Sequence, residues 1–215
     1  MIAPALARLI VLMMAQHTAT SRGDIASSHL LSPVFSHSMV LQRAPRSSRL
    51  FGQAPPGTVV SVTLAPAPGH MGDTANATAA ADGTWVAALP PRPASRGRSI
   101  SVVSSADGAS VNLFDVAFGD VFICTGQSNM AVEVGNRLMM NQSAELAAAR
   151  LYDVRLYNNG VMWPPNPKVP NETWAAANAT TLSGFSNLCW LTGRDTFRAL
   201  GGKVTIGLVS SCVGG

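Results

Sequence analysis

The chain has 215 residues, of which 47% are hydrophobic and only 12% are charged, and its formal net charge is +4. This composition excludes an intrinsically disordered chain, because disorder goes with low hydrophobicity and many charges. The arginines are scattered and no basic run is interleaved with aromatic residues, so the charge does not predict a nucleic-acid surface. The length fits one large domain or two small ones.

Residues 1–22 predict a secretory signal peptide. Arg8 precedes the apolar run 9–15, which is too short to cross a bilayer, and small residues follow as far as Ser21. A buried terminal helix is the alternative interpretation of this run. No later segment of the sequence is long and apolar enough to cross a membrane, so no span is expected after signal cleavage.

Four Asn-x-Ser/Thr sequons add to the prediction of export. The candidate glycosylation sites are Asn76, Asn141, Asn171 and Asn178. Each sequon alone is a weak signal, because the pattern is short and common. Together with the leader they predict a glycoprotein that is secreted or lysosomal.

Three cysteines, Cys124, Cys189 and Cys212, cannot all pair within the chain. Their neighbours are apolar, so we expect them to be small buried hydrophobic side chains rather than reactive groups. No Cys/His spacing in the sequence could hold zinc, and neither a metal nor another cofactor is expected.

Residues 25–117 predict a small antiparallel β-sandwich. Four short β-prone segments, 59–64, 83–89, 99–103 and 111–114, are spaced regularly, with Gly-, Pro- and Asp-containing turns between them. Short strands with this punctuation are typical of sandwiches.

From residue 118 to residue 215 the pattern changes to alternating strands and helices. The expected elements are an apolar strand 120–124, a helix 143–150 with Ser143 as a candidate N-cap, a strand 153–157, a polar loop over roughly 158–184, a helix from 185 to 200 that stops at Gly201 and Gly202, and a buried strand 204–209. This order predicts the α/β class, with a parallel sheet and crossover helices.

The predicted sheet has about three parallel strands, which is few for such a domain. The apolar strand 204–209 is of the kind that normally lies inside a sheet. A chain that ends at Gly215 would leave this strand or its neighbour as an open hydrophobic edge. The sequence therefore predicts an α/β domain whose remainder is missing.

The segment 126–130, Gly-Gln-Ser-Asn-Met, follows directly on the apolar strand 120–124. A tight turn there would place the hydroxyl of Ser128 at the carboxyl end of the sheet, where open α/β sheets hold their active sites. Met130 replaces the closing glycine of the G-x-S-x-G elbow, so the α/β-hydrolase pattern is not matched. All four histidines lie upstream of this serine: His17, His29, His37 and His70.

Four blocks, in order, resemble the sialate O-acetylesterases, which are SGNH-type hydrolases: HSMVLQRAP, FGDVFICTGQSNM, CWLTGRDTF and IGLVSSCVGG. Related acetyl-xylan esterases share the GQSNM and GG blocks, whereas the MVLQ and CW..GR blocks favour the sialate type. The resemblance covers nearly the whole chain. It implies a three-layer SGNH-hydrolase-like α/β domain over 118–215, present only in its N-terminal part and preceded by the β-sandwich.

The resemblance implies removal of O-acetyl groups from sialic acids or other carbohydrates, at the 9- and sometimes the 4-position of sialic acid, through an acetyl-serine intermediate. By resemblance Ser128 is the catalytic nucleophile, and its backbone N–H and that of Gly214 or Gly215 form the oxyanion hole. The family's tryptophan before this glycine pair is Val213 here. The family's later Asp/His pair has no counterpart in these 215 residues, so we expect the chain alone to be nearly inactive.

Two other interpretations stay open at this point. One is a non-catalytic secreted fragment that binds glycans or a partner protein. The other is an esterase that acts on acetylated xylan or another plant or microbial polysaccharide. In both esterase interpretations the partner is an acetylated carbohydrate, and no nucleic acid is expected.

Overall fold

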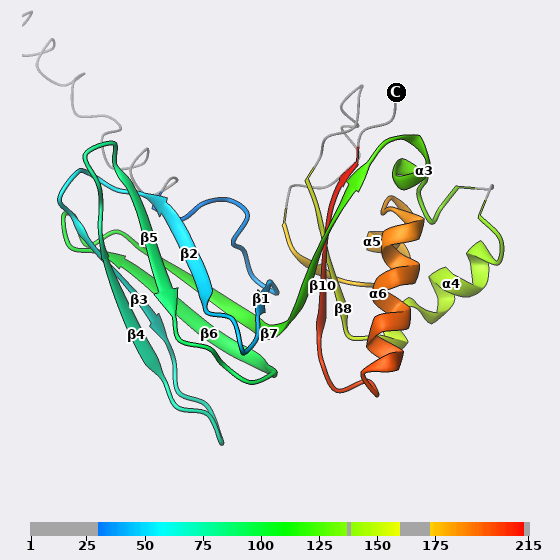
Figure 1. The fold of residues 1–215 in the computed structure, drawn as a ribbon, viewed down its shortest axis with the longest axis horizontal. Helices are drawn as coiled ribbons and strands as arrows, with labels where there is room; N and C mark the ends of the chain where they lie inside the picture. Colours follow the sequence, from blue (N-terminus) through cyan, green and yellow to red (C-terminus); the bar gives the residue numbers. More distant parts are fainter. Residues whose placement is uncertain (1–29, 137–138, 160–172, 213–215) are drawn as a thin grey trace, which may run out of the picture.

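The computed structural model describes residues 30–136, 139–159 and 173–212 (Figure 1). Two halves follow one another along the chain. We call residues 30–119 the β half and the described residues from 120 to 212 the α/β half. The predicted signal peptide and the sequon at Asn171 lie outside the described residues.

The β half consists of short strands in two sheets. Its elements are β1 (Val40–Gln42), β2 (Ser48–Gln53), β3 (Val59–Leu64), β4 (Asp73–Thr78), β5 (Thr84–Leu89), β6 (Ser95–Ser104) and the first part of β7 (Ser110–Gly126). β4, β3, β6 and β7 pair antiparallel in this order, and β1 pairs parallel with the other side of β7. β2 and β5 form a separate antiparallel pair.

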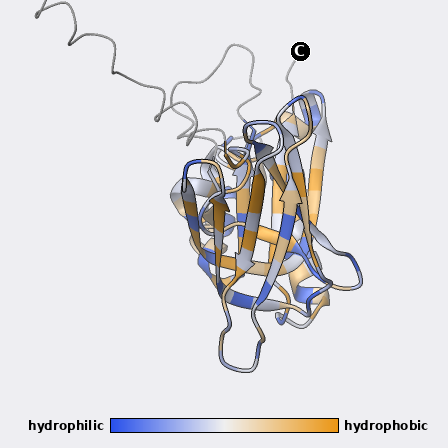
Figure 2. Ribbon diagram, turned by 90° about the vertical axis from the view of Figure 1, so that its left-hand side faces the viewer, coloured by the Kyte–Doolittle hydropathy of each residue, from blue (hydrophilic) through white to orange (hydrophobic). Residues whose placement is uncertain are grey.

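One hydrophobic core lies between these two sheets. Every second residue of β5 is buried, and Trp85 is only 1% exposed, because successive side chains of a strand point to opposite faces. Figure 2 shows the resulting bands of hydrophobic and hydrophilic residues along the strands. The indole N–H of Trp85 donates to the Leu30 carbonyl at 2.9 Å, so the core holds this polar group with its hydrogen bond made.

The α/β half contains a second set of strands with helices. Its elements are α3 (Ser128–Ala131), α4 (Gln142–Ala148), a 3₁₀ turn (Ala149–Leu151), β8 (Val154–Asn158), β9 (Ala175–Ala176), α5 (Ala179–Ser183), α6 (Asn187–Ala199) and β10 (Ile206–Cys212). The sheet order is β7, β10, β8, β9. The first three strands are parallel and β9 is antiparallel to β8. The prediction of a mixed α/β fold with a central sheet is confirmed.

The strand that comes last in the sequence lies inside this sheet. β10 pairs with β7 on one side and with β8 on the other. It has five buried positions among its seven residues, as expected for an apolar strand with neighbours on both sides. The second part of β7 therefore becomes the edge of the sheet among the described strands.

α6 covers one face of this sheet (Figure 1). Trp190 of α6 and Leu208 of β10 are both fully buried in the core between them. A Cβ at Gly193 would lie 2.6 Å from Leu208 Cδ1, so glycine is what allows the helix to approach the strand this closely.

Two predicted strands are in fact one. The prediction of separate strands at 111–114 and 120–124 is wrong, because β7 runs for 17 residues from Ser110 to Gly126 and takes part in both halves. Residues 116–119 lie buried between β1 and β6, so the chain has pairing partners where the sequence suggested a break. The division into domains at 25–117 and 118–215 stays a prediction.

Two local predictions also need correction. Asn141, with a φ of 59°, is the N-cap residue of α4, and Ser143 lies inside this helix. The predicted loop 158–184 contains α5, whose N-cap Asn178 and residue Thr181 form a capping box. The segment is short and polar, so its hydrophobic pattern did not predict a helix. The capping box stabilises this helix by satisfying backbone N–H groups at its start.

Candidate active site around Ser128

Ser128 is the first residue of α3, directly after the carboxyl end of β7. The turn is closed by Met130 N–H, which donates to the Gln127 carbonyl at 2.8 Å. Gly126 has a φ of 148°, and a Cβ there would lie 2.8 Å from Met130 Cγ. Glycine is therefore required for both the backbone conformation and the contact with Met130. Gln127 and Ser128 are exposed, so the serine is accessible to a substrate.

The segment after α3 holds the turn against the start of α6. Val134 N–H donates to the Phe185 carbonyl at 2.8 Å, and Asn187 N–H donates to the Val132 carbonyl at 2.8 Å. A Cβ at Gly135 would lie 2.4 Å from Ser183 Oγ, which explains a glycine at this close approach. The backbone around Ser128 is thus fixed by residues far away in the sequence.

A disulfide joins Cys124 to Cys189, and this corrects the expectation that all three cysteines are unpaired. Their Cα atoms are 5.9 Å apart, although the residues are 65 positions apart in the sequence. Cys124 lies in β7 just before the turn, and Cys189 lies in the first turn of α6. Cys212 is free and buried, as expected, and its thiol donates to the Cys124 carbonyl at 3.4 Å. The disulfide therefore ties the strand that carries Ser128 to the helix beneath it.

The CW..GR block of α6 has a structural role throughout. Cys189 forms the disulfide, Trp190 is buried, and Gly193 contacts Leu208. Arg194 pairs with Glu145, which also accepts the Trp190 indole N–H at 2.8 Å. The hydrogen bond from Arg194 to Asp195 raises the pKa of Arg194, and the Glu145 charge acts in the same direction. These contacts position α6 on the sheet and on α4.

The carboxyl ends of three parallel strands meet at the Ser128 edge of the sheet. Cys212 of β10 is in register with Gly126 of β7. Gly214 and Gly215, predicted for the oxyanion hole, follow Cys212 but lie outside the described residues, so their role stays a prediction. So does the catalytic role of Ser128.

Asn159, which follows β8, is a polar residue at this edge that the sequence analysis did not single out. Its backbone N–H donates to the Ser210 carbonyl at 3.0 Å, and its side chain donates to Ser211 Oγ at 3.3 Å. The available signal was its position two residues after the predicted strand 153–157, since polar residues at strand ends of parallel sheets gather at one edge.

No imidazole of the described residues lies near Ser128. His37 Nδ1 accepts the Phe114 N–H at 3.1 Å, and its ring stacks on that of Phe114. Phe114 and Gly126 are both in β7, so on the order of 40 Å of strand separates His37 from the turn. His70 lies in the connection between β3 and β4. His17 and His29 lie outside the described residues.

The three described sequons differ in how free their asparagines are. Asn76 in β4 and Asn141 before α4 are exposed. Asn178 accepts hydrogen bonds from the Thr180 and Thr181 backbone N–H groups, and its own amide donates to the Ala176 carbonyl at 3.2 Å. Glycosylation at all four sequons stays a prediction.

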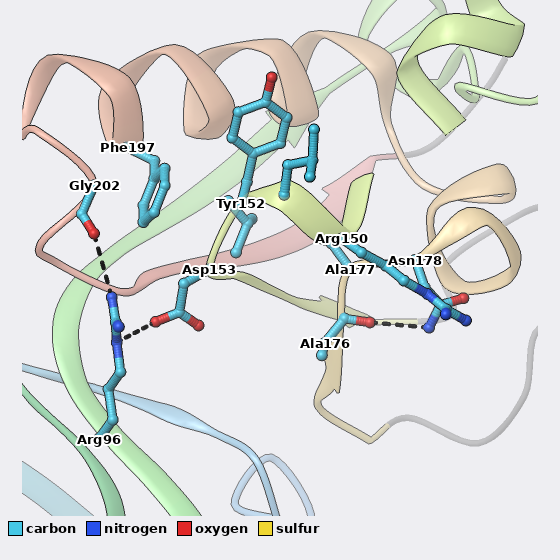
Figure 3. A pocket seen from close by; sticks show the side chains of 11 residues that line it. Arg96, Arg150, Tyr152, Asp153, Ala176, Ala177, Asn178, Phe197 and Gly202 are labelled. Carbon is cyan, nitrogen blue, oxygen red and sulfur yellow. Dashed lines mark hydrogen bonds and ion pairs between the residues drawn. The ribbon is translucent and has the colours of Figure 1, made fainter. Parts of the chain in front are cut away.

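A cavity of about 510 Å³ lies at the other end of the sheet, where the two halves meet (Figure 3). Arg96 of the β half pairs there with Asp153 at 2.5 Å, immediately before the first residue of β8. Because Ser128 lies at the carboxyl end of the strands, this cavity is not part of the candidate active site. Among the described residues, no group of three His, Cys, Asp or Glu could hold a metal ion, and no helix could span a membrane.

Comparison with known proteins gives relatives of one kind. The mouse sialate O-acetylesterase is 30% identical over 192 residues, which cover 82% of this chain and 34% of the relative. The human sialate O-acetylesterase is 29% identical over 191 residues, which cover 82% of this chain and 35% of the relative. No family model matches the chain.

A solved structure gives the same result for the fold. The carbohydrate acetylesterase from Xanthomonas citri superposes with a TM-score of 0.69 at 26% identity, over 86% of this chain and 40% of that chain. The chain spans about a third of the length of the curated relatives that it matches. Over this region, in sequence and in fold, the chain belongs to the sialate O-acetylesterase family.

Proposed function

We propose that this chain provides the nucleophile for hydrolysis of O-acetyl esters on carbohydrates, with Ser128 as the attacking residue. The observation that carries the proposal is the position of Ser128: exposed, directly after a strand of a parallel sheet, and next to the end of β10. The family of esterases to which the chain belongs supports the same role. A rigid turn at this place presents a hydroxyl to a substrate without burying it.

The reaction follows from the chemistry of a serine nucleophile. Ser128 Oγ attacks the acetyl carbonyl while a base takes the hydroxyl proton, and the resulting oxyanion accepts hydrogen bonds from backbone N–H groups. The backbone N–H of Ser128 and that of Gly214 or Gly215 are the proposed donors. Breakdown of the tetrahedral intermediate gives acetyl-Ser128 and the sugar hydroxyl, which takes up the proton. Water then releases acetate and restores the serine.

The base is the part of this machinery that the described residues do not provide. Neither His37 nor His70 approaches the turn at 126–131, and a serine without its base loses on the order of 10⁶ in turnover. We therefore propose that these 215 residues by themselves hydrolyse acetyl esters very slowly. The base would come from polypeptide that corresponds to the unmatched two thirds of the relatives.

The substrate class that the relatives support is an acetylated carbohydrate. We propose O-acetylated sialic acid as the preferred substrate, in line with the names of the mouse and human relatives. The Xanthomonas citri relative is described more broadly, as a carbohydrate acetylesterase, so acetylated polysaccharide is the second candidate. The Cys124–Cys189 disulfide supports the proposal of a secreted or lysosomal protein, because structural disulfides persist in oxidising compartments.

The proposal is tested by producing the chain together with the unmatched part of the mouse sialate O-acetylesterase. Hydrolysis of 9-O-acetyl sialic acid and of acetylated xylan is then measured for the wild type, Ser128→Ala and the control Ser110→Ala, which changes an exposed serine at the start of β7. We expect activity on the sialic acid that is lost in Ser128→Ala and kept in Ser110→Ala. Hydrolysis that survives Ser128→Ala would refute the role of this serine.

The same assay on the 215-residue chain alone tests the missing base. We expect wild type and Ser128→Ala to hydrolyse p-nitrophenyl acetate at the same slow rate. Turnover at an ordinary esterase rate that depends on Ser128 would show that a base is already present in this chain.

A further inference from the structure

The cavity of about 510 Å³ between the two halves is remote from Ser128 (Figure 3). It lies at the amino end of β8, where Val154 is in register with Ile206 of β10, and Ile206 is in register with Asp120 of β7. Along β7, Asp120 and Gly126 are on the order of 20 Å apart, and Ser128 follows beyond Gly126. A ligand the size of one sugar in this cavity would therefore not reach the nucleophile.

The size and the wall of this cavity suit a small organic ligand. Ligand pockets typically measure about 300–1,000 Å³, occur where domains meet, and combine apolar walls with a few polar groups. Leu151 and Phe197 contribute apolar surface here. The polar side chains of the wall are those of Arg96, Arg150, Asp153 and Asn178. Such a wall fits a ligand with an apolar face and polar substituents, as a sugar ring has.

The described wall of the cavity carries two guanidinium groups and one carboxylate. Arg96 Nε lies 2.5 Å from Asp153 Oδ2, which also accepts a hydrogen bond from the Thr205 hydroxyl at 2.5 Å. Arg155 Nε lies 3.8 Å from the other Asp153 oxygen. Among the described residues, no acidic side chain pairs with Arg150, which is exposed. Because Asp153 is already engaged with two arginines, the charge of Arg150 favours an anionic ligand.

Arg150 and Asn178 lie on the side of the cavity opposite to Arg96, and the Arg150 guanidinium extends toward the Asn178 amide (Figure 3). This amide is held in place, because its oxygen accepts two backbone N–H groups of α5 and its nitrogen donates to the Ala176 carbonyl at 3.2 Å. An asparagine amide has two N–H groups, so one is left for a ligand. A guanidinium binds a carboxylate through two parallel hydrogen bonds. This side of the cavity is thus arranged to hold a carboxylate and a neighbouring oxygen.

We infer that this cavity is a second carbohydrate site, separate from the candidate active site, for a sugar that carries a carboxylate. Arg150 binds the carboxylate, Asn178 donates to an adjacent oxygen, and the ring packs against Phe197. The choice of a sugar rests on the proposed function. Sialic acids and uronic acids share this chemistry. Occupation of the site would anchor an acidic glycan while a different sugar of the same glycan reaches Ser128.

The test measures ligand binding by the full 215-residue chain. The chain is produced in the bacterial periplasm, where the disulfide forms and Asn178 carries no glycan. N-acetylneuraminic acid, its neutral methyl ester, glucuronic acid and inorganic phosphate are titrated, and the NMR shifts of the Ala177 and Gly202 backbone N–H groups report on the cavity. We expect the methyl ester to bind at least about tenfold more weakly than the acid, because it lacks the carboxylate charge. The sugar acid that binds more tightly identifies the source of the ligand.

Two arginine variants locate the binding group. Arg150→Gln removes the charge from the cavity, whereas Arg46→Gln makes the same change at an exposed arginine between β1 and β2. We expect Arg150→Gln to weaken binding of the preferred sugar acid at least about tenfold, Arg150→Lys to weaken it less, and Arg46→Gln to leave it unchanged. All three variants should melt like the wild type without ligand, because both arginines are exposed.

The outcomes separate this inference from the proposed function. Ser128→Ala should bind the sugar acid as tightly as the wild type, so failure of the proposed activity would leave this site intact. Binding that is lost in Ser128→Ala would place the sugar at the candidate active site and overturn the second site. Equal affinity for the acid and its methyl ester, or for wild type and Arg150→Gln, would overturn the carboxylate contact. Phosphate that binds as tightly as the sugar acids, with the same shifts, would show a simple anion site and overturn the assignment to a sugar.

Discussion

The β half and the α/β half differ in how completely they bury their sheets. In the β half, two sheets enclose a core in which Val62, Trp85 and Leu89 are at most 1% exposed. In the α/β half, α6 covers one face, but among the described residues no strand pairs with the outer side of β7 beyond Gly119. β7 belongs to both halves: Phe118 is fully buried, and Ile123, in the same strand, is 71% exposed. Burial of an apolar residue therefore depends on the elements beside it, which the strand's own sequence does not specify.

The largest effect is expected for Trp85→Ala in the β half. Removing a fully buried aromatic side chain leaves a cavity, which typically costs about 3–5 kcal/mol of unfolding free energy. The change also leaves the Leu30 carbonyl without the indole donor. Urea unfolding should show this loss, whereas Val86→Ala, at the next and 57% exposed position, should change stability by no more than about 0.5 kcal/mol. Equal costs at the two positions would contradict the closed core.

Removal of the disulfide, which lies within the α/β half, should destabilise that half more than the β half. The double variant Cys124→Ser, Cys189→Ser opens a link between residues 65 positions apart, and the loss is expected to be about 2–4 kcal/mol. Hydrogen exchange should accelerate in α6 and in the turn at 126–131, while β3, β5 and β6 keep their protection. Faster exchange in the β half before the α/β half would show that the disulfide does not act locally.

Gly126→Ala tests the turn that presents Ser128. The φ of 148° and the contact with Met130 should together cost about 2–3 kcal/mol. Gly57→Ala is the matched control, because its φ is 79° but nothing lies within 4 Å of a Cβ, so only about 1–2 kcal/mol of backbone strain is expected. Thermal unfolding of both variants measures the difference. Adding Met130→Ala to Gly126→Ala should recover part of it, and no recovery would refute the contact.

The smallest effect is expected on the exposed side of α6, at Asp195. The hydrogen bond from Arg194 lowers the pKa of Asp195. The interaction therefore stabilises the fold above the ordinary carboxylate pKa and is lost as the pH falls through the lowered value. Because the side chain is 60% exposed, Asp195→Asn should cost only about 0.5 kcal/mol at pH 7. The difference in melting temperature from wild type should shrink between pH 7 and pH 3, and a growing difference would contradict this sign.

Much of the local structure was predictable from sequence patterns. The segment 59–64 is a strand with the predicted bounds, and the predicted strands 83–89, 153–157 and 204–209 lie within two or three residues of β5, β8 and β10. The helix before Gly201 and Gly202 ends there, and both glycines have positive φ. Side-chain periodicity and turn residues act over a few positions, so the sequence carries this information directly.

By itself, the sequence determined the α/β class, the family and the placement of Ser128 directly after an apolar strand. Only the tertiary structure decided that β7 is continuous through both halves, that β10 lies between β7 and β8, that Cys124 pairs with Cys189, and that the CW..GR block serves packing. These features join residues tens of positions apart. They depend on which elements become neighbours in the folded chain. Hydrophobic periodicity describes only a few consecutive residues, so it does not predict those contacts.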